Sequence, residues 1–356
     1  MSFNRLVADD FVVSTDSITA GLWGDSSTPN LSTFVTSSAQ AAGSSGDYYL
    51  NVFSAGTSAG PSELEFAVTY GNSNGGGSLL FDPAVAERSP SSTIYGSYRT
   101  LVLGDENATF SFGGVTSSDF WAISIDRNRY KESLFPGSLT LIISGSDAAA
   151  GGGMLSLTDN SQIVTTTTFN DAGRVFQIVS GSAGTVFTGV NNNGYSLASG
   201  SYGFFLPDIA TLLLNPRAIT SGNTGVSKSF ADVKPVTTAN TNGNNPGILI
   251  RAISASANPS PNPALPFTLN SQENITSDFV FVRPRSSEYN YSSNPSFISG
   301  STGEVLFNSF INNPQTYMTT VGLYNDTNEL LAVAKLSKPL PKDFTKEALV
   351  RVKLDF

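Results

Sequence analysis

The stretch "FWAISIDRNRYKESLFPGSLTLIIS", residues 120–144, places two apolar segments on either side of a charged one. Apolar residues alternate with small polar ones at 120–125 and at 139–144, and Asp, Pro and Gly lie close to these segments. Alternation with a period of two residues, bounded by turn-forming residues, is typical of β-strands. This part of the chain therefore predicts two strands joined by a charged connection.

The same pattern recurs along the chain. Further strands are predicted at 63–70, 174–180 and 278–283. The segment "TTVGLYNDTNELLAVAKL" (319–336) predicts a β-hairpin with "NDTN" at its tip, and "ALVRVKLDF" (348–356) predicts a half-buried terminal strand. The expected fold class is mainly β, with β-sandwich-like modules, long Gly/Ser/Asn/Pro-rich loops and a few short helices.

The composition agrees with many short strands. Charged residues make up 13% of the 356 residues, and the chain contains 33 Gly, 24 Phe and 12 Tyr. Soluble domains usually carry about 25% charged residues. Aromatic and β-branched residues fit a pleated surface, whereas Gly, Asn and Pro form turns. The low charge also indicates that other protein covers part of the surface.

Helical signals are few and short. Asp82 followed by Pro83 predicts a short helix within 82–88. Single helical turns are expected within 129–134, 207–215 and 342–348.

The chain is expected to contain two β regions. Residues 1–218 form the N-terminal region and 266–356 the C-terminal region, with its hairpin and terminal strand. Between them, residues 219–265 are rich in Pro, Asn and Gly, which predicts a loop or linker that does not bury a core.

The sequence contains no Cys and no His. Thiolate nucleophiles, thiolate or imidazole metal sites and Ser–His dyads are therefore excluded. The Gly-rich segments lack the lysine of a phosphate-binding loop, and no Asn/Asp cluster matches a calcium loop. We assign no catalytic residue, cofactor or metal ligand, although an oxygen-only metal site and a carboxylate pair remain open. No segment of signal-peptide or membrane-spanning character is evident, and we expect a soluble protein made in a cytoplasm.

Paired carboxylates are a candidate catalytic feature, because glycosidases use two of them. Glu63 and Glu65 would share one face of their predicted strand. A retaining glycosidase holds its two carboxyl groups about 5 Å apart, usually on different strands. No supporting motif accompanies this pair, so a solvated strand face is the favoured interpretation. We expect no enzymatic activity.

Charge is unevenly distributed along the chain. The net charge is −9, and residues 1–120 carry 12 acidic and 3 basic side chains. The last 22 residues reverse this balance, with 6 basic and 3 acidic side chains. An acidic body disfavours nonspecific nucleic-acid binding, and a basic end favours head-to-tail contact between protein neighbours. The candidate interaction residues of the basic end are Lys335, Lys338, Lys342 and Lys346.

A second candidate interaction patch lies in the opening stretch. On an extended chain, Arg127, Arg129 and Lys131 share one face and Tyr130 lies on the other. These cations could contact phosphates, pair with carboxylates of the chain itself, or meet the carboxylates of a partner. We expect an exposed docking patch, so replacing both arginines with Ala should leave folding nearly intact.

Several segments resemble known virion proteins. They are "MSFNRLVADDFVVSTDSITAGLW" (1–23), "RNRYKESLFPGSLTLIIS" (127–144), "DAGRVFQIVSGS" (171–182), "SYGFFLPDIATLLLNP" (201–216) and residues 286–356. This set is similar to structural proteins of contractile-tailed myophages that infect cyanobacteria. Residues 319–336 are also similar to the hairpin of phage tail-collar and baseplate-to-fibre proteins.

The resemblance implies a structural subunit of a phage virion, in the tail baseplate or fibre-attachment region. Such a subunit docks other tail or baseplate proteins in several copies within a symmetric assembly, without catalysis, nucleic acid or membrane insertion. The alternatives are a neck or collar component, and a receptor-binding or glycan-degrading tail fibre protein. Residues 37–62 and 219–265 carry no matching motif.

Overall fold

The computed structural model shows a mainly β protein, as the sequence predicts, with 46% of residues in strands and 16% in helices. It describes residues 4–22, 35–36, 49–53, 63–78, 81–85, 88–145, 153–187, 194–195, 198–220, 230, 233–237, 245–256, 267–292 and 294–355.

The chain forms two compact units. The larger unit is Ile18–Glu273, and the smaller unit combines Met1–Ser17 with Asn274–Phe356. The chain passes between the units within β1 (Phe11–Gly21) and within β17 (Asn270–Val282). This division differs from a boundary across 219–265, because the N-terminal segment groups with the C-terminal strands.

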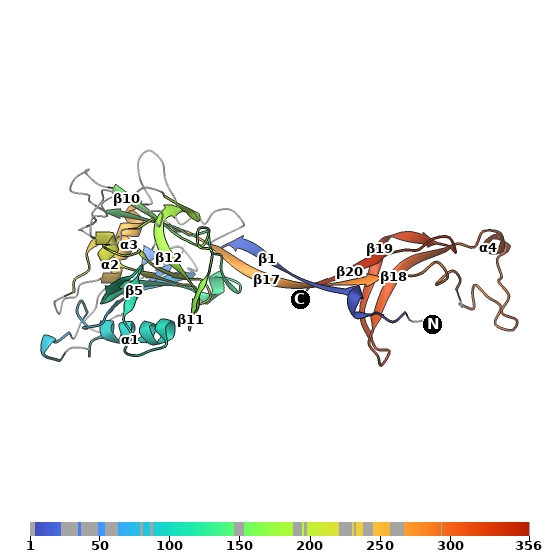
Figure 1. Ribbon diagram of the computed structural model, residues 1–356, viewed down its shortest axis with the longest axis horizontal. Helices are drawn as coiled ribbons and strands as arrows, with labels where there is room; N and C mark the ends of the chain where they lie inside the picture. The colour runs from blue at the N-terminus through green and yellow to red at the C-terminus, as the bar shows by residue number, and fades with distance from the viewer. Residues whose placement is uncertain are drawn as a thin grey trace. The chain divides into compact units, whose positions relative to one another are not determined.

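A large antiparallel sheet forms the larger unit (Figure 1). Strands β11 (Thr168–Asn170) and β13 (Thr185–Val186) extend it by pairing with β12. A separate hairpin consists of β5 (Phe110–Phe112) and β6 (Val115–Ser117). The order of the main strands is β16 (Phe267–Thr268), β9 (Thr140–Gly145), β10 (Gly153–Asp159), β12 (Gly173–Ser182), β14 (Gly203–Leu206), β15 (Thr211–Leu214), β7 (Asp119–Ile125), β4 (Leu64–Asn72), β3 (Tyr49–Phe53) and β2 (Val35–Thr36).

The central strands are buried on both faces. In β15, Leu212 and Leu214 enter one hydrophobic core, whereas Leu213 enters a second core on the opposite face. Strands that are buried on both faces appear in the sequence as continuous apolar runs, which also suit a buried helix. The helical turn expected within 207–215 is therefore wrong: residues 207–210 form a turn and β15 follows.

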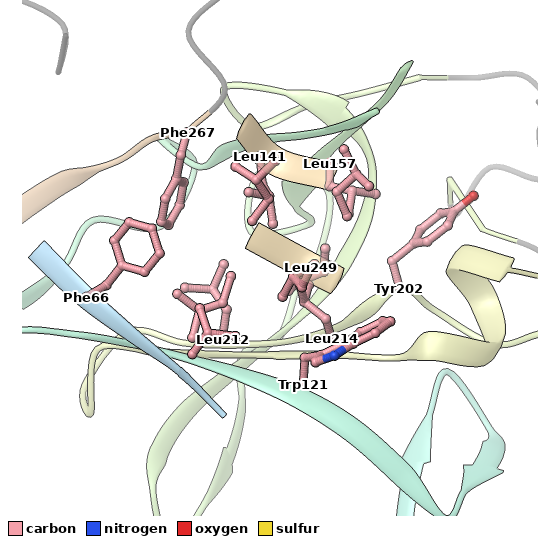
Figure 2. Packing of buried hydrophobic residues seen from close by; sticks show 14 of the residues in the cluster. Phe66, Trp121, Leu141, Leu157, Tyr202, Leu212, Leu214, Leu249 and Phe267 are labelled. Carbon is pink, nitrogen blue, oxygen red and sulfur yellow. The ribbon is translucent and has the colours of Figure 1, made fainter. Parts of the chain in front are cut away.

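The first core lies inside a curled sheet. The rings of Phe66 on β4 and Phe267 on β16 are 5.5 Å apart between centroids, although many strands separate β4 from β16 in the sheet order. Helix α3 (Asn245–Ser256) packs against both β9 and β4. Figure 2 shows its Leu249 side chain among the core leucines, and Leu249 is fully buried.

The expectation that 219–265 buries no core is thus wrong for α3. The indole Nε1 of Trp121 donates a hydrogen bond of 3.0 Å to the carbonyl oxygen of Asn245, the first residue of this helix. The Asn245 side chain donates to the carbonyl oxygens of Gly77 and Val236, at 3.1 and 3.0 Å. These contacts join the start of α3 to the sheet and to a neighbouring loop.

The second core lies beneath helix α1 (Pro90–Leu103), which the sequence analysis did not predict. Pro90 occupies the first turn, and Gly104 ends the helix in the left-handed conformation with φ 66°. Tyr95 is buried against the rings of Phe110 and Phe120, at centroid distances of 5.5 and 5.4 Å. The Ser-Pro pair and the final Gly are the signals that could have indicated it.

Other short elements complete the larger unit. The helix expected within 82–88 reduces to the 3-10 turn η3 (Pro83–Val85), and residues 86–87 lie outside the described residues. Within 129–134 no helical turn follows η4 (Arg127–Arg129), because strand β8 (Ser133–Leu134) pairs with β17. Helix α2 is Pro216–Thr220.

The smaller unit contains two layers of strands. Strand β17 lies between β1 and β20 (Val350–Asp355), and β18 (Thr316–Tyr324) pairs with β19 (Leu330–Lys342) as a hairpin (Figure 1). The predicted hairpin and terminal strand are confirmed. Residues 342–348 contain a hydrogen-bonded turn instead of a helix. The remaining elements are η1 (Ala8–Asp10) and α4 (Asn308–Asn312).

One face of the hairpin packs on the three-stranded layer. Its inward side chains are Val321, Leu323, Ala334 and Leu336, and they join a cluster with Val280, Val350 and Val352.

Candidate functional site

The basic patch of the opening stretch is a helical turn and not an extended strand. Arg127–Arg129 form η4, and the Asp126 side chain accepts a hydrogen bond of 2.9 Å from the Asn128 backbone N–H. The Arg127 guanidinium lies 4.7 Å from the centroid of the Tyr130 ring and donates to the Tyr130 carbonyl oxygen at 2.8 Å. The expectation that Tyr130 points away from the cations is therefore wrong.

Arg129 is an internal support of the larger unit. Its Nε lies 3.1 Å from Glu65 Oε2 and donates to the Leu64 carbonyl oxygen at 3.1 Å, while its Nη2 pairs with Glu63 Oε2. The Glu65 side chain is only 4% exposed, so the favoured view of this carboxylate as part of a solvated face is wrong. Lys131 is exposed. All three cations were expected to be exposed for docking, and this expectation is wrong for Arg129.

We expect Arg129→Ala to lower the free energy of unfolding by about 1–3 kcal/mol, because the buried Glu65 carboxylate loses its counter-ion. Arg127→Ala should lower it by no more than about 1 kcal/mol, because exposed cation–π contacts are weak. Urea unfolding of the two single variants measures this difference. Equal effects of the two substitutions would contradict an internal role for Arg129. Replacing both Arg127 and Arg129 with Ala is therefore expected to lower the free energy of unfolding, and no longer to leave folding nearly intact.

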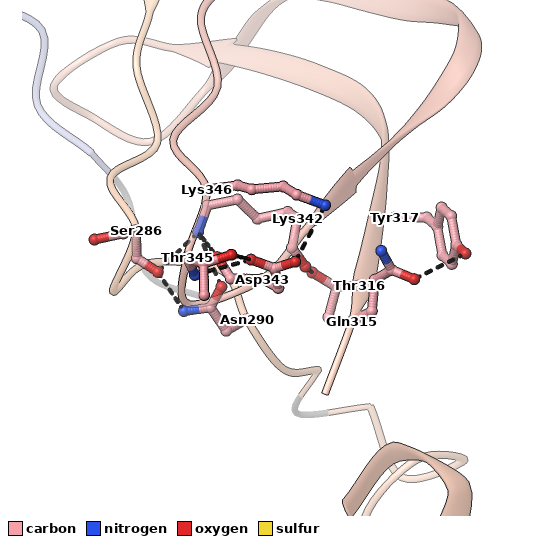
Figure 3. A network of polar contacts seen from close by, with 9 residues as sticks. All are labelled: Ser286, Asn290, Gln315, Thr316, Tyr317, Lys342, Asp343, Thr345 and Lys346. Atoms are coloured by element: carbon pink, nitrogen blue, oxygen red, sulfur yellow. Dashed lines mark hydrogen bonds and ion pairs between the residues drawn. The ribbon is translucent and has the colours of Figure 1, made fainter. Parts of the chain in front are cut away.

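The basic C-terminal residues do not form one patch. Lys335 and Lys338 are exposed on β19, and Lys346 is exposed and pairs with Asp343 Oδ2 at 3.3 Å. Lys342 is fully buried, which contradicts its expected role as a docking residue. Its Nζ donates to the Ser286 carbonyl oxygen, Asn290 Oδ1 and the Asp343 carbonyl oxygen, at 2.9, 2.9 and 3.1 Å (Figure 3).

The Lys342 network joins two segments of the smaller unit. The Asn290 side chain, itself 2% exposed, donates to the Ser286 carbonyl oxygen at 2.7 Å. Between them, Tyr289 has a positive φ of 52°, which is strained for an aromatic residue. The three acceptors satisfy the three N–H groups of an ammonium ion. Lys342 therefore secures the 286–290 turn to the end of β19.

Asp343 begins the turn that follows β19. Its carboxylate accepts hydrogen bonds from the Thr345 hydroxyl and backbone N–H, at 2.6 and 2.8 Å. These hydrogen bonds, followed by the contact with Lys346, lower the pKa of Asp343 below its ordinary value.

In the larger unit, the buried Tyr70 forms a polar pair with the half-buried Asp119. The Tyr70 hydroxyl donates to Asp119 Oδ2 at 2.9 Å, and the Asn72 side chain donates to the same hydroxyl at 3.2 Å. Burial, opposed in part by the Tyr70 hydrogen bond, raises the pKa of Asp119. Burial, together with the Asp119 carboxylate, also raises the pKa of Tyr70 well above its ordinary value.

This pair predicts a pH dependence. Between the ordinary value of 3.8 and the raised pKa of Asp119, the folded state binds more protons than the unfolded state. The contribution of this group to stability therefore increases as pH falls through the raised pKa. We expect Asp119→Asn, which keeps the acceptor for Tyr70, to remove that increase. Urea unfolding of both proteins from pH 7 down to pH 4 measures it, and identical pH profiles would contradict it.

The smaller unit exposes apolar side chains that the sequence analysis missed. On β1, Phe11, Val12 and Val13 are 49%, 49% and 67% exposed. Adjacent apolar residues in a strand point to opposite faces, and this was the available signal. The outward face of the β18–β19 hairpin also carries exposed apolar side chains: Tyr317, Tyr324, Leu331 and Val333.

Other signals are negative for the residues that the structure describes. Among them, no group of three or more Asp or Glu side chains is placed to hold a metal ion. In the same part of the chain, no helix has both the length and the apolar character needed to cross a membrane. Comparisons with protein-family models, curated proteins and solved structures found no match.

Proposed function

We propose that this protein is a structural subunit of a bacteriophage virion, in the tail baseplate or fibre-attachment region, that acts by protein–protein docking. The observation that carries the docking role is the exposed apolar surface of the smaller unit, on β1 and on the outward face of the hairpin. The virion context is supported by the resemblance of five sequence segments to myophage structural proteins.

The arrangement of the apolar residues favours several neighbours over one. Val12 and Val13 are adjacent in β1, so their side chains leave opposite faces of the strand, and both are exposed. A partner that covers one face leaves the other in water. Contiguous exposed apolar surface is typical of interaction sites, and each buried Å² contributes about 25 cal/mol. Packing within an assembly covers both faces.

The carboxylate pair does not support catalysis. Glu63 and Glu65 both contact the same guanidinium group, that of Arg129. A glycosidase requires its two carboxyl groups on either side of a bound sugar. The absence of hydrolase activity remains a prediction. Metal-independent release of sugars from host envelope polysaccharide, abolished by Glu63→Gln or Glu65→Gln, would contradict it.

Labelling of intact virions tests the location. Gold-labelled antibodies against this protein should mark the baseplate or the fibre attachment points in electron micrographs. Label at the neck would replace the proposal with the collar alternative, and label at the fibre tips would favour a receptor-binding protein. Purified virions that lack the protein would refute a virion role.

A further inference from the structure

The three-stranded layer of the smaller unit has two open edges. Strand β17 lies in the middle, and within the described residues β1 and β20 each pair with β17 alone. Strands β1 and β20 are therefore the edge strands of this layer. Such edges readily pair with another chain, and proteins usually block them with Lys, Pro or a bulge.

The β1 edge lacks that protection. Residues 11–16 read "FVVSTD" and contain neither Lys nor Pro. The distal end of β19, in contrast, contains Pro339 and Pro341. Phe11 and Val13 are 49% and 67% exposed, so the β1 edge is both apolar and open to pairing.

The two edges differ in charge. The β1 side carries Asp9 and Asp16, both exposed, together with Asp10 and a single cation, Arg5. The β20 edge exposes Arg351, Lys353 and Asp355. Lys353 Nζ forms an ion pair with Asp355 Oδ1 at 2.9 Å, so the three side chains together carry one net positive charge.

The cations of β20 are held in place. The Arg351 guanidinium and the Lys353 ammonium lie 5.1 and 6.0 Å from the centroid of the Phe279 ring on β17. Both cations therefore remain on the outward face of β20. Their charge is opposite to that of the acidic β1 side.

We propose that the β1 edge of one molecule pairs with the β20 edge of a second copy of this chain. The inference rests on the proposed docking role and names the partner. A second copy is the occupant because each chain carries both complementary edges, one acidic and apolar and the other basic. Contact between two different surfaces of identical chains is head-to-tail, and it closes into a ring or continues as a filament.

Charge reversal on the full-length protein tests this interface. Native mass spectrometry and light scattering should show an oligomer that weakens as salt is raised. The acidic-edge variant Asp9→Lys/Asp16→Lys and the basic-edge variant Arg351→Glu/Lys353→Glu should each weaken association by about tenfold or more. The variant with all four substitutions restores opposite charges, and it should associate like the unsubstituted protein.

A matched control and a folding check accompany these variants. Glu106→Lys/Asp326→Lys makes the same change in net charge as the acidic-edge variant, at exposed residues outside β1 and β20, and association should persist. Circular dichroism melting verifies folding. If the basic-edge variant does not fold, Arg351→Gln/Lys353→Gln takes its place.

The outcomes separate this inference from the proposed function. A protein that is monomeric at every concentration, yet incorporated in virions, overturns self-association and leaves the virion role intact. Association unaffected by either charge reversal, or not restored by the combined variant, overturns this interface. Monomers that bind another virion protein through β1 indicate a different partner and also overturn it.

Discussion

Leu141→Asp is expected to unfold the larger unit. Leu141 is fully buried in β9, where its register partners are Leu157 on β10 and Phe267 on β16. Loss of a buried leucine side chain costs about 2–3 kcal/mol, and a carboxylate placed in an apolar core costs several more. The sum approaches the total stability of an ordinary domain, about 5–15 kcal/mol. Circular dichroism and Trp fluorescence should show loss of the cooperative transition.

Phe169→Asp is the matched control for this substitution. Phe169 lies on β11 in the same unit and is 69% exposed, so a carboxylate there remains in water. Its melting transition should remain close to that of the unsubstituted protein. A cooperative, unshifted transition in the Leu141→Asp variant would show that β9 does not contribute to the core.

Lys342→Met should destabilise the smaller unit more than any other single lysine substitution. Methionine fills a similar volume but has no donor for the three oxygens that Lys342 contacts. The Ser286 and Asp343 carbonyl oxygens keep hydrogen bonds from the Asn290 side chain and the Lys346 backbone N–H, whereas Asn290 Oδ1 loses the Lys342 donor. A buried acceptor that loses its donor costs about 1–3 kcal/mol, which is the loss expected here. The 286–290 turn and the end of β19 should separate first, because Lys342 joins them.

Hydrogen exchange with mass spectrometry resolves this effect by segment. Peptides that cover 286–290 and 316–342 should lose protection, whereas peptides of the larger unit should retain it. Lys338→Met is the control, because Lys338 is exposed on the same strand. Lys342→Arg should not restore stability, since a planar guanidinium does not match three acceptors arranged around an ammonium. Unchanged exchange at 286–290 would contradict the role of Lys342.

The strands and the hairpin could be predicted because their signals are local. Residues 120–125 and 319–336 combine apolar alternation with turn residues at their ends, and the structure places strands and a hairpin there. Helix α3 could not be predicted in this way. Its segment lies between Pro- and Asn-rich stretches, and Leu249 is stabilised by packing on strands that are distant in sequence.

At the candidate site, local sequence identifies the charged residues, but contacts between distant segments decide which of them are internal. Residues 127–131 attract attention as a basic cluster, but no local pattern distinguishes Arg129 from Arg127. The distinction arises because Glu63 is 66 residues from Arg129 along the chain and only folding brings the two together. The exposed apolar residues of β1 were equally ambiguous, since adjacent valines suit a core strand as well as an uncovered one.

By itself, the sequence determined that this chain is mainly β and where many of its strands and turns lie, because backbone preferences and side-chain alternation act over a few residues. Only the tertiary structure decided which cations are internal. Lys342 and Lys338 are four residues apart in one basic segment, yet Lys342 is buried against Asn290, 52 residues away, and Lys338 is exposed. Burial depends on which distant segments meet, and the free energy of a charge depends on the partners and water around it.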